Sequence, residues 1–266
     1  MSYQLGRLAG PGEVTDPHGV GAQADAPANP FERVDGTYEA VRPEYPPSIV
    51  EAIVTSCERD VPRIGDVGAG TGKMTRLLSA AGADVWAIEP APAMVSQLAR
   101  YVDASRIRQA RAEATGLEDD SLEALVYAQS WHWLDARCAA AEAARVLTAS
   151  GTVWIVFNQL DVRVEWVRRL TRIMRSGDVH RPDKPPLLGP NFGAPALTMR
   201  VWEDALTPAE VMALARTRSS YLRSSESGRA HMQANLRWYL GDHLGYGPGQ
   251  PIRLPYYTLA WRFARA

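Results

Sequence analysis

The stretch DVGAGTGKMT, from Asp66 to Thr75, decides the fold of this chain. It follows a short apolar run and opens a segment with apolar residues at helical spacing, so it predicts a turn between a buried strand and a helix. Glycines at positions 68, 70 and 72 let the backbone turn sharply and approach a ligand without a Cβ clash. Because the helix start beyond them offers unpaired N–H donors, the stretch predicts a nucleotide-binding turn.

The spacing of the glycines separates three kinds of turn. A phosphate-binding P-loop needs Lys followed by Ser or Thr after a longer gap, and Lys73-Met74 does not fit. A dinucleotide fingerprint would place its third glycine where Lys73 stands. The spacing therefore disfavours a nicotinamide-dependent oxidoreductase, which stays the alternative enzyme class, and an ordinary glycine-rich turn is the third possibility.

A second acidic residue, Glu89, follows Gly68 by 21 positions, at the end of the next apolar run. An acid at about this distance commonly binds ribose hydroxyls, to which a carboxylate makes charge-assisted hydrogen bonds. The alternative is a residue that merely flanks a helix start before Pro90. Together with the glycine turn, Glu89 favours a ligand that contains a ribose.

Apolar runs and helix-like segments alternate between residue 61 and about residue 158. This alternation predicts a mostly parallel sheet with helices on both faces. The predicted strands are 61–67, 83–89, 106–112, 123–129 and 151–157, and the predicted helices are 73–81, 92–102 and 135–147.

The two ends of the chain have a different texture. Residues 1–30 are rich in Gly, Pro and Ala and predict a flexible leader. The expected elements beyond residue 158 are a helix over 162–174, a loop over 176–197, a helix that begins with a capping box at Thr207, a helix over 225–240 and a final strand over 251–265.

Composition excludes several classes of function. The formal net charge of -1 gives no basic footprint for nucleic acid, and no apolar stretch approaches the length of a membrane span. No cluster of potential metal ligands is visible, so no metal is expected. The two cysteines lie far apart and no signal peptide is visible, which favours a reduced, cytoplasmic protein.

Four segments of the chain resemble the class I S-adenosylmethionine-dependent methyltransferases, in particular the methyltransferase-11 group. They are Asp66–Gly72, Ala87–Pro90, Ala112–Ala114 and Arg145–Gly151. The segments Tyr38–Pro46 and His132–Asp135 resemble the trans-aconitate methyltransferase-like subgroup. The resemblance implies an α/β, Rossmann-like fold with a mostly parallel seven-stranded sheet, helices on both faces and a helical lid. A non-catalytic protein on the same fold is the alternative.

The resemblance also implies which residues bind S-adenosylmethionine. The methionine half is assigned to Asp66, Gly68, Ala69 and Gly70, the ribose to Glu89, the adenine to Ala112 and Glu113, the sulfonium region to Gln129, and a closing segment to Tyr38 and Arg42. We expect one methyltransferase domain over 31–266, with a cofactor-binding core over 47–160, acceptor-covering elements over 160–250 and the final strand over 251–265.

The acceptor is expected where the fourth strand of the core ends, because ligands of open α/β sheets bind beyond the carboxyl ends of the strands. His132 is the candidate general base, and its alternative is a packing histidine. The expected substrate-contacting residues are Trp131, Trp133, Tyr221 and Trp238, with burial as the alternative for at least one of the first two. A small soluble acceptor with a hydroxyl or carboxylate group is predicted. The carboxylate rests on Arg42, Arg223 and the subgroup resemblance.

Overall fold

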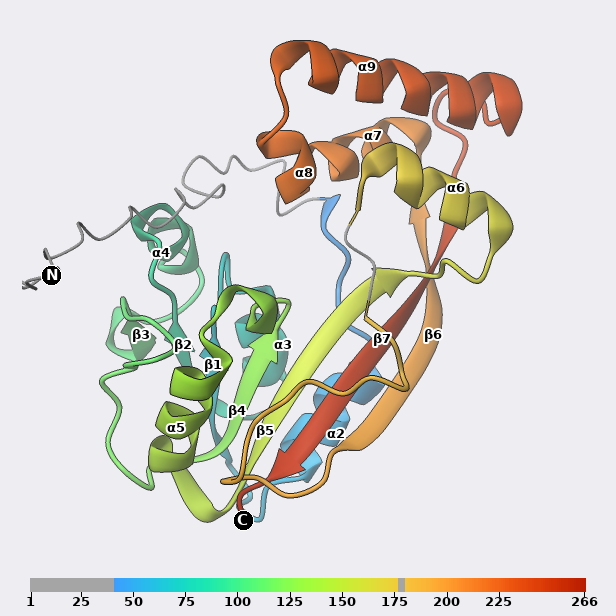
Figure 1. Ribbon diagram of the computed structural model, residues 1–266. Helices are drawn as coiled ribbons and strands as arrows, with labels where there is room; N and C mark the ends of the chain where they lie inside the picture. The colour runs from blue at the N-terminus through green and yellow to red at the C-terminus, as the bar shows by residue number, and fades with distance from the viewer. Residues whose placement is uncertain (1–40, 177–179) are drawn as a thin grey trace, which may run out of the picture.

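The computed structural model describes residues 41–176 and 180–266 of the chain. In this part, seven strands form one sheet in the order β3-β2-β1-β4-β5-β7-β6 (Figure 1). Neighbouring strands from β3 to β5 are parallel, and β7 is antiparallel to both β5 and β6. The strands are β1 (Arg63–Val67), β2 (Asp84–Ile88), β3 (Ile107–Arg108), β4 (Leu122–Ala128), β5 (Leu147–Leu160), β6 (Ala196–Leu206) and β7 (Ile252–Ala264). The predicted mostly parallel, seven-stranded sheet is confirmed.

Helices cover both faces of the sheet because its central strands are apolar on both sides. On β4, Ala124 and Val126 face α2 (Pro47–Thr55) and α3 (Lys73–Ala80). Leu125 and Tyr127 face the alanine-rich α5 (Ala136–Val146) instead. The shorter α4 (Pro92–Leu98) packs through Leu98 near the start of the glycine turn.

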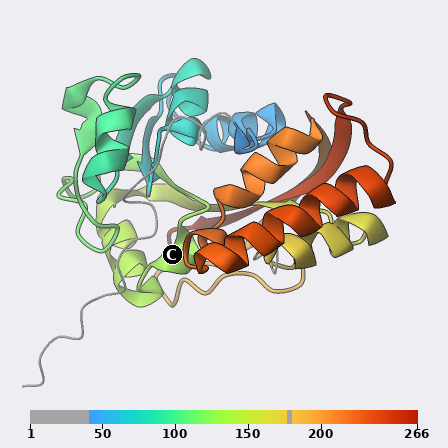
Figure 2. The ribbon, with the colours of Figure 1, turned by 90° about the horizontal axis from the view of Figure 1, so that it is seen from above.

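A separate helical layer forms the predicted lid beyond the carboxyl ends of β5 and β6 (Figures 1 and 2). It consists of α6 (Glu165–Met174), α7 (Pro208–Arg216), α8 (Ser219–Leu222), α9 (Glu226–Arg237) and the π-helical turn η3 (Trp238–His243). Apolar residues of these helices form their own buried cluster with the ends of β5, β6 and β7. None of the described helices is long and apolar enough to cross a membrane.

The predicted capping box at the start of α7 is confirmed. The Thr207 hydroxyl accepts a hydrogen bond from the Glu210 amide, and the Glu210 carboxylate accepts one from the Thr207 amide at 2.7 Å. Both partners satisfy backbone donors that the first helical turn leaves unpaired. Sequence alone therefore located this helix start correctly.

Two expectations about strands were wrong. The strand predicted over 106–112 has only the residues Ile107–Arg108, and the chain then turns at an isolated bridge between Arg111 and Ala114. Strand β6 was not predicted, and its first residues lie at the end of the expected loop over 176–197. It is an edge strand with mostly exposed side chains, so it lacks the apolar run by which buried strands are detected.

Strand β5 begins earlier than the predicted strand over 151–157, and its pairing with β4 is irregular before Thr152. Gly151 lies in this irregular stretch. A Cβ atom on Gly151 would lie 2.9 Å from both the Thr148 carbonyl oxygen and the Leu147 Cβ atom. Because one of these atoms belongs to the backbone, the strand cannot admit a side chain here without shifting.

We therefore expect Gly151→Ala to lower the free energy of unfolding by about 1–3 kcal/mol, the usual cost of overpacking. Urea denaturation followed by circular dichroism measures this change. Gly193→Ala is the matched control, because its Cβ would come no closer than 3.8 Å to its nearest neighbour, the Ala264 carbonyl oxygen. Equal stability of both variants would contradict the proposed crowding.

Candidate active site

In the turn after β1, each of the three positions occupied by glycine favours that residue for a different physical reason. Gly68 has a φ of +74°, and a Cβ there would lie 2.5 Å from the Ser130 Cβ. Gly72 has a φ of +88°, and its Cβ would lie 2.5 Å from Leu98 Cδ1. Gly70 has a φ of +58° but no atom within 4 Å of the Cβ position. Gly68 and Gly72 are thus required by packing, whereas Gly70 borders open space that a ligand can approach closely.

Glu89, directly after β2, fastens this turn to the sheet. One carboxylate oxygen accepts a hydrogen bond from the Gly70 amide and the other from the Ala91 amide, each at 2.9 Å. Burial raises the pKa of Glu89, and these two backbone donors oppose the rise. Because each carboxylate oxygen has two lone pairs, Glu89 keeps acceptor capacity for a pair of ribose hydroxyls.

Asp66, at the carboxyl end of β1, is a second buried acid. Its Oδ2 atom accepts a hydrogen bond from the Thr75 hydroxyl at 2.6 Å, and its buried Oδ1 atom has no partner among the described residues. Burial raises the pKa of Asp66 to about 7, against the Thr75 hydrogen bond, and the charge of Glu89 raises it further. Two neighbouring carboxyl groups that resist ionisation form a site that a cationic ligand stabilises.

The described chain begins with a segment, residues 41–46, that we call the N-terminal strap. Lys73, at the start of α3, donates to the carbonyl oxygen of Arg42 at 2.9 Å and to Glu44 Oε1 at 2.8 Å. The Asn158 amide on β5 donates to the carbonyl oxygen of Glu44 at 2.9 Å. The strap therefore spans from the glycine turn to the end of β5.

The same strap reaches the lid through Arg42, whose guanidinium donates to the Thr217 carbonyl at the end of α7, at 2.7 Å. This contact places Arg42 between the cofactor turn and the lid, although its direct partner is a backbone carbonyl. Tyr38, the other residue expected to close over the cofactor, lies outside the described residues.

The residues expected around the adenine lie in the turn after β3. Ala112 is buried, and half-buried Glu113 accepts hydrogen bonds from the Asp135 amide at 3.1 Å and from Arg111 at 3.2 Å. Gln129 follows β4 with a φ of +57°, and its side-chain amide donates to the Asn158 carbonyl at 2.6 Å. That hydrogen bond holds the Gln129 side chain against β5. The expected contact of Gln129 with the sulfonium stays a prediction.

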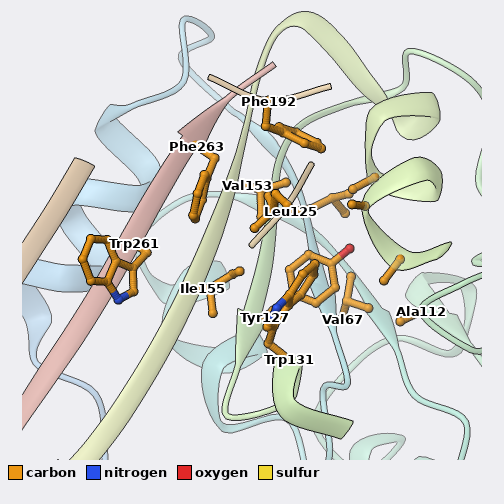
Figure 3. Packing of buried hydrophobic residues seen from close by; sticks show 14 of the residues in the cluster. Val67, Ala112, Leu125, Tyr127, Trp131, Val153, Ile155, Phe192, Trp261 and Phe263 are labelled. Atoms are coloured by element: carbon orange, nitrogen blue, oxygen red, sulfur yellow. The ribbon is translucent and has the colours of Figure 1, made fainter. Parts of the chain in front are cut away.

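Trp131 and Trp133 lie on a short 3-10 turn after β4, and they face different environments. Trp131 is buried and meets Tyr127 edge to face, with ring centroids 4.9 Å apart (Figure 3). Trp133 is exposed and lies beside the exposed His132, with ring centroids 5.0 Å apart. Trp131 therefore belongs to the core, whereas Trp133 and His132 are exposed on the turn that follows the end of β4.

Another histidine, His180, was not singled out from the sequence. Its ring stacks on Phe157 of β5 with centroids 3.6 Å apart, and it lies 5.9 Å from the ring of His132. The groups packed around His132 lower its pKa to about 4 by removing part of its hydration, although the residue keeps an open side to solvent, and the charges of His180 and Arg42 add to this effect. No spacing rule identifies His180, because the Pro/Gly-rich segment that carries it has no periodicity.

The two remaining substrate candidates flank α9, with Tyr221 on α8 before it and Trp238 directly after it. The Arg229 guanidinium lies 5.6 Å from the Tyr221 ring centroid. Trp238 stacks with His243 at 5.4 Å and lies under Arg169 at 5.7 Å. These contacts place Trp238 on the α6 side of the lid and do not bring it to the strand ends.

Metal chemistry has no visible basis in the described residues. Within residues 41–176 and 180–266, no group of three or more His, Cys, Asp or Glu side chains is arranged to hold a metal ion. Cys57 and Cys138 are both free thiols. Burial raises the pKa of Cys57 to about 11, which makes this thiol a poor ligand and nucleophile.

Comparison with known proteins decides the family. Residues 65–155 match the family model of a methyltransferase domain. An uncharacterized methyltransferase of Mycobacterium tuberculosis is 35% identical over 233 residues, which are 87% of this chain and 94% of the relative. This chain belongs to the class I S-adenosylmethionine-dependent methyltransferases. The methyltransferase assignment replaces both alternatives, a nicotinamide-dependent oxidoreductase and a non-catalytic protein.

Solved structures share the methyltransferase fold. One, assigned as a type II methyltransferase from Anaeromyxobacter dehalogenans, has a TM-score of 0.52 at 21% identity and covers 83% of this chain and 97% of its own. Another, assigned to an antibiotic biosynthesis pathway of Anabaena variabilis, has a TM-score of 0.53 at 18% identity and covers 80% and 96%. At these identities the likeness concerns the fold alone.

The residues of this methyltransferase fit its cofactor. S-adenosylmethionine supplies a methyl group on a positively charged sulfonium sulfur. Gly70 leaves room for close approach, Glu89 has spare acceptor capacity, and the buried Oδ1 atom of Asp66 has no hydrogen-bond partner within the described part of the chain. The free space at Gly70 and the two buried acids therefore suit a nucleoside that carries a positive charge.

We expect Glu89→Ala to weaken S-adenosylmethionine binding by about 1.5–3 kcal/mol for each ribose hydrogen bond removed, because these bonds involve a charged acceptor. Isothermal titration calorimetry measures the affinity. Glu118→Ala, at an exposed acid outside the turn, is the control for the loss of a negative charge. Unchanged affinity in a folded Glu89→Ala protein would refute the assignment.

S-adenosylmethionine affinity should also depend on Asp66. Because the pKa of Asp66 in the free protein is raised to about 7, a bound cation favours its ionised form, and binding releases a proton below that pH. Affinity should therefore rise as the pH rises toward about 7 and then level off. Calorimetry in buffers of different ionisation enthalpy measures the proton release, which Asp66→Asn should abolish.

Proposed function

We propose that this methyltransferase transfers the methyl group to a small, soluble acceptor bound between the end of β4 and a cover made of the strap and the lid. The observation that carries the proposal is the hydrogen bond from Arg42 of the strap to Thr217 of α7, which joins the two parts of the cover. His132 and Trp133, on the turn directly after β4, are exposed. A cover of this kind suits a compact acceptor.

The proposed roles of the cofactor residues follow the geometry of the turn. Asp66, Gly68, Ala69 and Gly70 would line the methionine half, Glu89 the ribose, Ala112 and Glu113 the adenine, and Gln129 the sulfonium region. We accordingly propose residues 47–160 as the cofactor-binding part and residues 160–250 as the acceptor-covering part of one domain. The buried cluster that the lid helices share supports this division.

His132 is proposed as the proton acceptor for a hydroxyl group. Its lowered pKa keeps the imidazole neutral at pH 7, so its lone pair is available. A weak base suffices here, because a hydroxyl oxygen becomes strongly acidic as its bond to the methyl carbon forms. In-line placement of oxygen, methyl carbon and sulfur supplies the rest of the rate acceleration.

The acceptor class can be tested with methyl-labelled S-adenosylmethionine and a cell extract separated into small-molecule, protein and nucleic-acid fractions. The proposal expects label mainly in the small-molecule fraction. Label mainly on protein or RNA would refute a small acceptor, even if the enzyme binds its cofactor as expected.

We expect His132→Gln to lower kcat by about 10²-fold, at the low end for loss of a general base, without changing the affinity for S-adenosylmethionine. Because the pKa of His132 is lowered to about 4, the wild-type rate at saturating S-adenosylmethionine should show no decline near the ordinary histidine pKa and should fall only as the pH approaches 4. Single-turnover rates across pH measure both effects. His231→Gln, at an exposed site on α9, should leave the rate unchanged.

A further inference from the structure

We propose that His180 and His132 together form a two-imidazole acceptor site beside Phe157, which binds a hydroxyl-bearing acceptor and takes its proton during methyl transfer. The inference rests on the proposed function and names a second acceptor-site residue and the acceptor group. In this proposal, His180 contacts the acceptor and can take its proton, in addition to packing on Phe157.

The backbone of His180 is held in place from two strands. The Gln159 side chain on β5 accepts a hydrogen bond from the His180 amide at 2.7 Å and donates one to its carbonyl at 2.8 Å. The Tyr257 hydroxyl on β7 donates to the same carbonyl at 3.1 Å. Gln159 and Tyr257 are both buried, so the histidine is positioned by a rigid part of the sheet. Since these bonds use only backbone atoms of His180, they survive a change of its side chain.

The two imidazole rings lie close enough for one ligand atom to contact both. Their centroids lie 5.9 Å apart, and the His180 ring lies 11° from parallel to Phe157. One oxygen atom hydrogen-bonded to a nitrogen of each ring fits this separation, because each such bond measures about 2.7–3.0 Å. The Phe157 ring, which is itself buried under His180, fixes the orientation of that imidazole.

Methyl transfer to a hydroxyl group requires an acceptor for its proton, and the pair provides one. The acceptor oxygen forms a bond with the methyl carbon while the carbon–sulfur bond breaks, and its electron pair stays on sulfur. The hydroxyl proton passes to an imidazole nitrogen and then to water. The positive charge of the sulfonium thus leaves the site as a proton, and two neighbouring imidazoles offer it alternative acceptors.

The role of the pair as a proton acceptor, together with the charge nearby, favours a hydroxyl over the other acceptor groups. The charge of Arg42 helps to lower the pKa of His132, so the surroundings of the pair disfavour a second positive charge. An amine would enter such a site as a repelled ammonium ion. A carboxylate would be attracted, but it carries no proton for the two imidazoles to remove.

The decisive variants separate the stacking of His180 from its nitrogen atoms. His180→Phe keeps an aromatic ring on Phe157 and removes both nitrogens, and His231→Phe is the matched control at an exposed site on α9. The full-length protein is incubated with methyl-labelled S-adenosylmethionine and the small-molecule fraction of a cell extract. We expect His180→Phe to lose about 10²-fold in transfer rate with unchanged cofactor affinity, while His231→Phe retains the wild-type rate.

The chemistry of the product tests the acceptor class. A methyl ether keeps its label in alkali, whereas a methyl ester releases it as volatile methanol. Alkali-stable label together with the loss in His180→Phe supports the proposal. Full activity of His180→Phe, or label released by alkali, overturns it. Label mainly on protein or RNA in the wild type overturns the proposed function as well.

A titration by nuclear magnetic resonance tests the pair without any acceptor. If the imidazoles are coupled as the structure indicates, the pKa of His132 rises from about 4 in His180→Phe and stays unchanged in His231→Phe. An unchanged pKa of His132 in His180→Phe would overturn the pair, even if no acceptor has been labelled.

Discussion

The carboxylate of Glu89 is the interaction on which the cofactor side of this methyltransferase depends. By accepting from the Gly70 and Ala91 amides, it fixes the glycine turn relative to the end of β2. The same turn needs Gly68 to pass Ser130 and Gly72 to pass Leu98. Together with the hydrogen bonds from the Gly68 and Ala69 amides to the Ile88 carbonyl, this buried acid therefore holds the backbone of the turn against the end of β2.

A second constraint joins the acceptor side to the sheet. Asn158 on β5 accepts from the Thr258 hydroxyl at 2.6 Å, donates to Glu44 of the strap, and offers its backbone carbonyl to Gln129. The Trp202 indole completes this buried set by donating to Thr258 at 2.9 Å. Strands β4, β5, β6 and β7 and the strap thus share one hydrogen-bonded network, which explains how the antiparallel end of the sheet positions the cover.

Sequence patterns correctly located those elements that depend mainly on residues nearby in the chain. The glycine turn, Glu89 after β2 and the capping box at Thr207 were all placed correctly, because each depends on neighbours within a few residues or on one adjacent strand. The edge strand β6 was missed because its side chains are mostly exposed and its pairing partner, β7, lies some fifty residues further along the chain. The strand expected over 106–112 was overextended for the opposite reason, since its apolar pattern continues into a turn.

The sequence by itself determined a Rossmann-like sheet and a turn built for a nucleoside, because glycine spacing and apolar periodicity act over short distances. Tertiary structure alone decided that Trp131 is buried while Trp133, two residues later, is exposed, because Trp131 packs against Tyr127 in a core cluster that does not include Trp133. Only the fold brings His180 to His132 across 48 positions, since Gln159 and Tyr257 hold it from strands that are distant in the chain. Contacts of this kind depend on which strands become neighbours in the sheet, and a short sequence pattern does not predict which strands will pair.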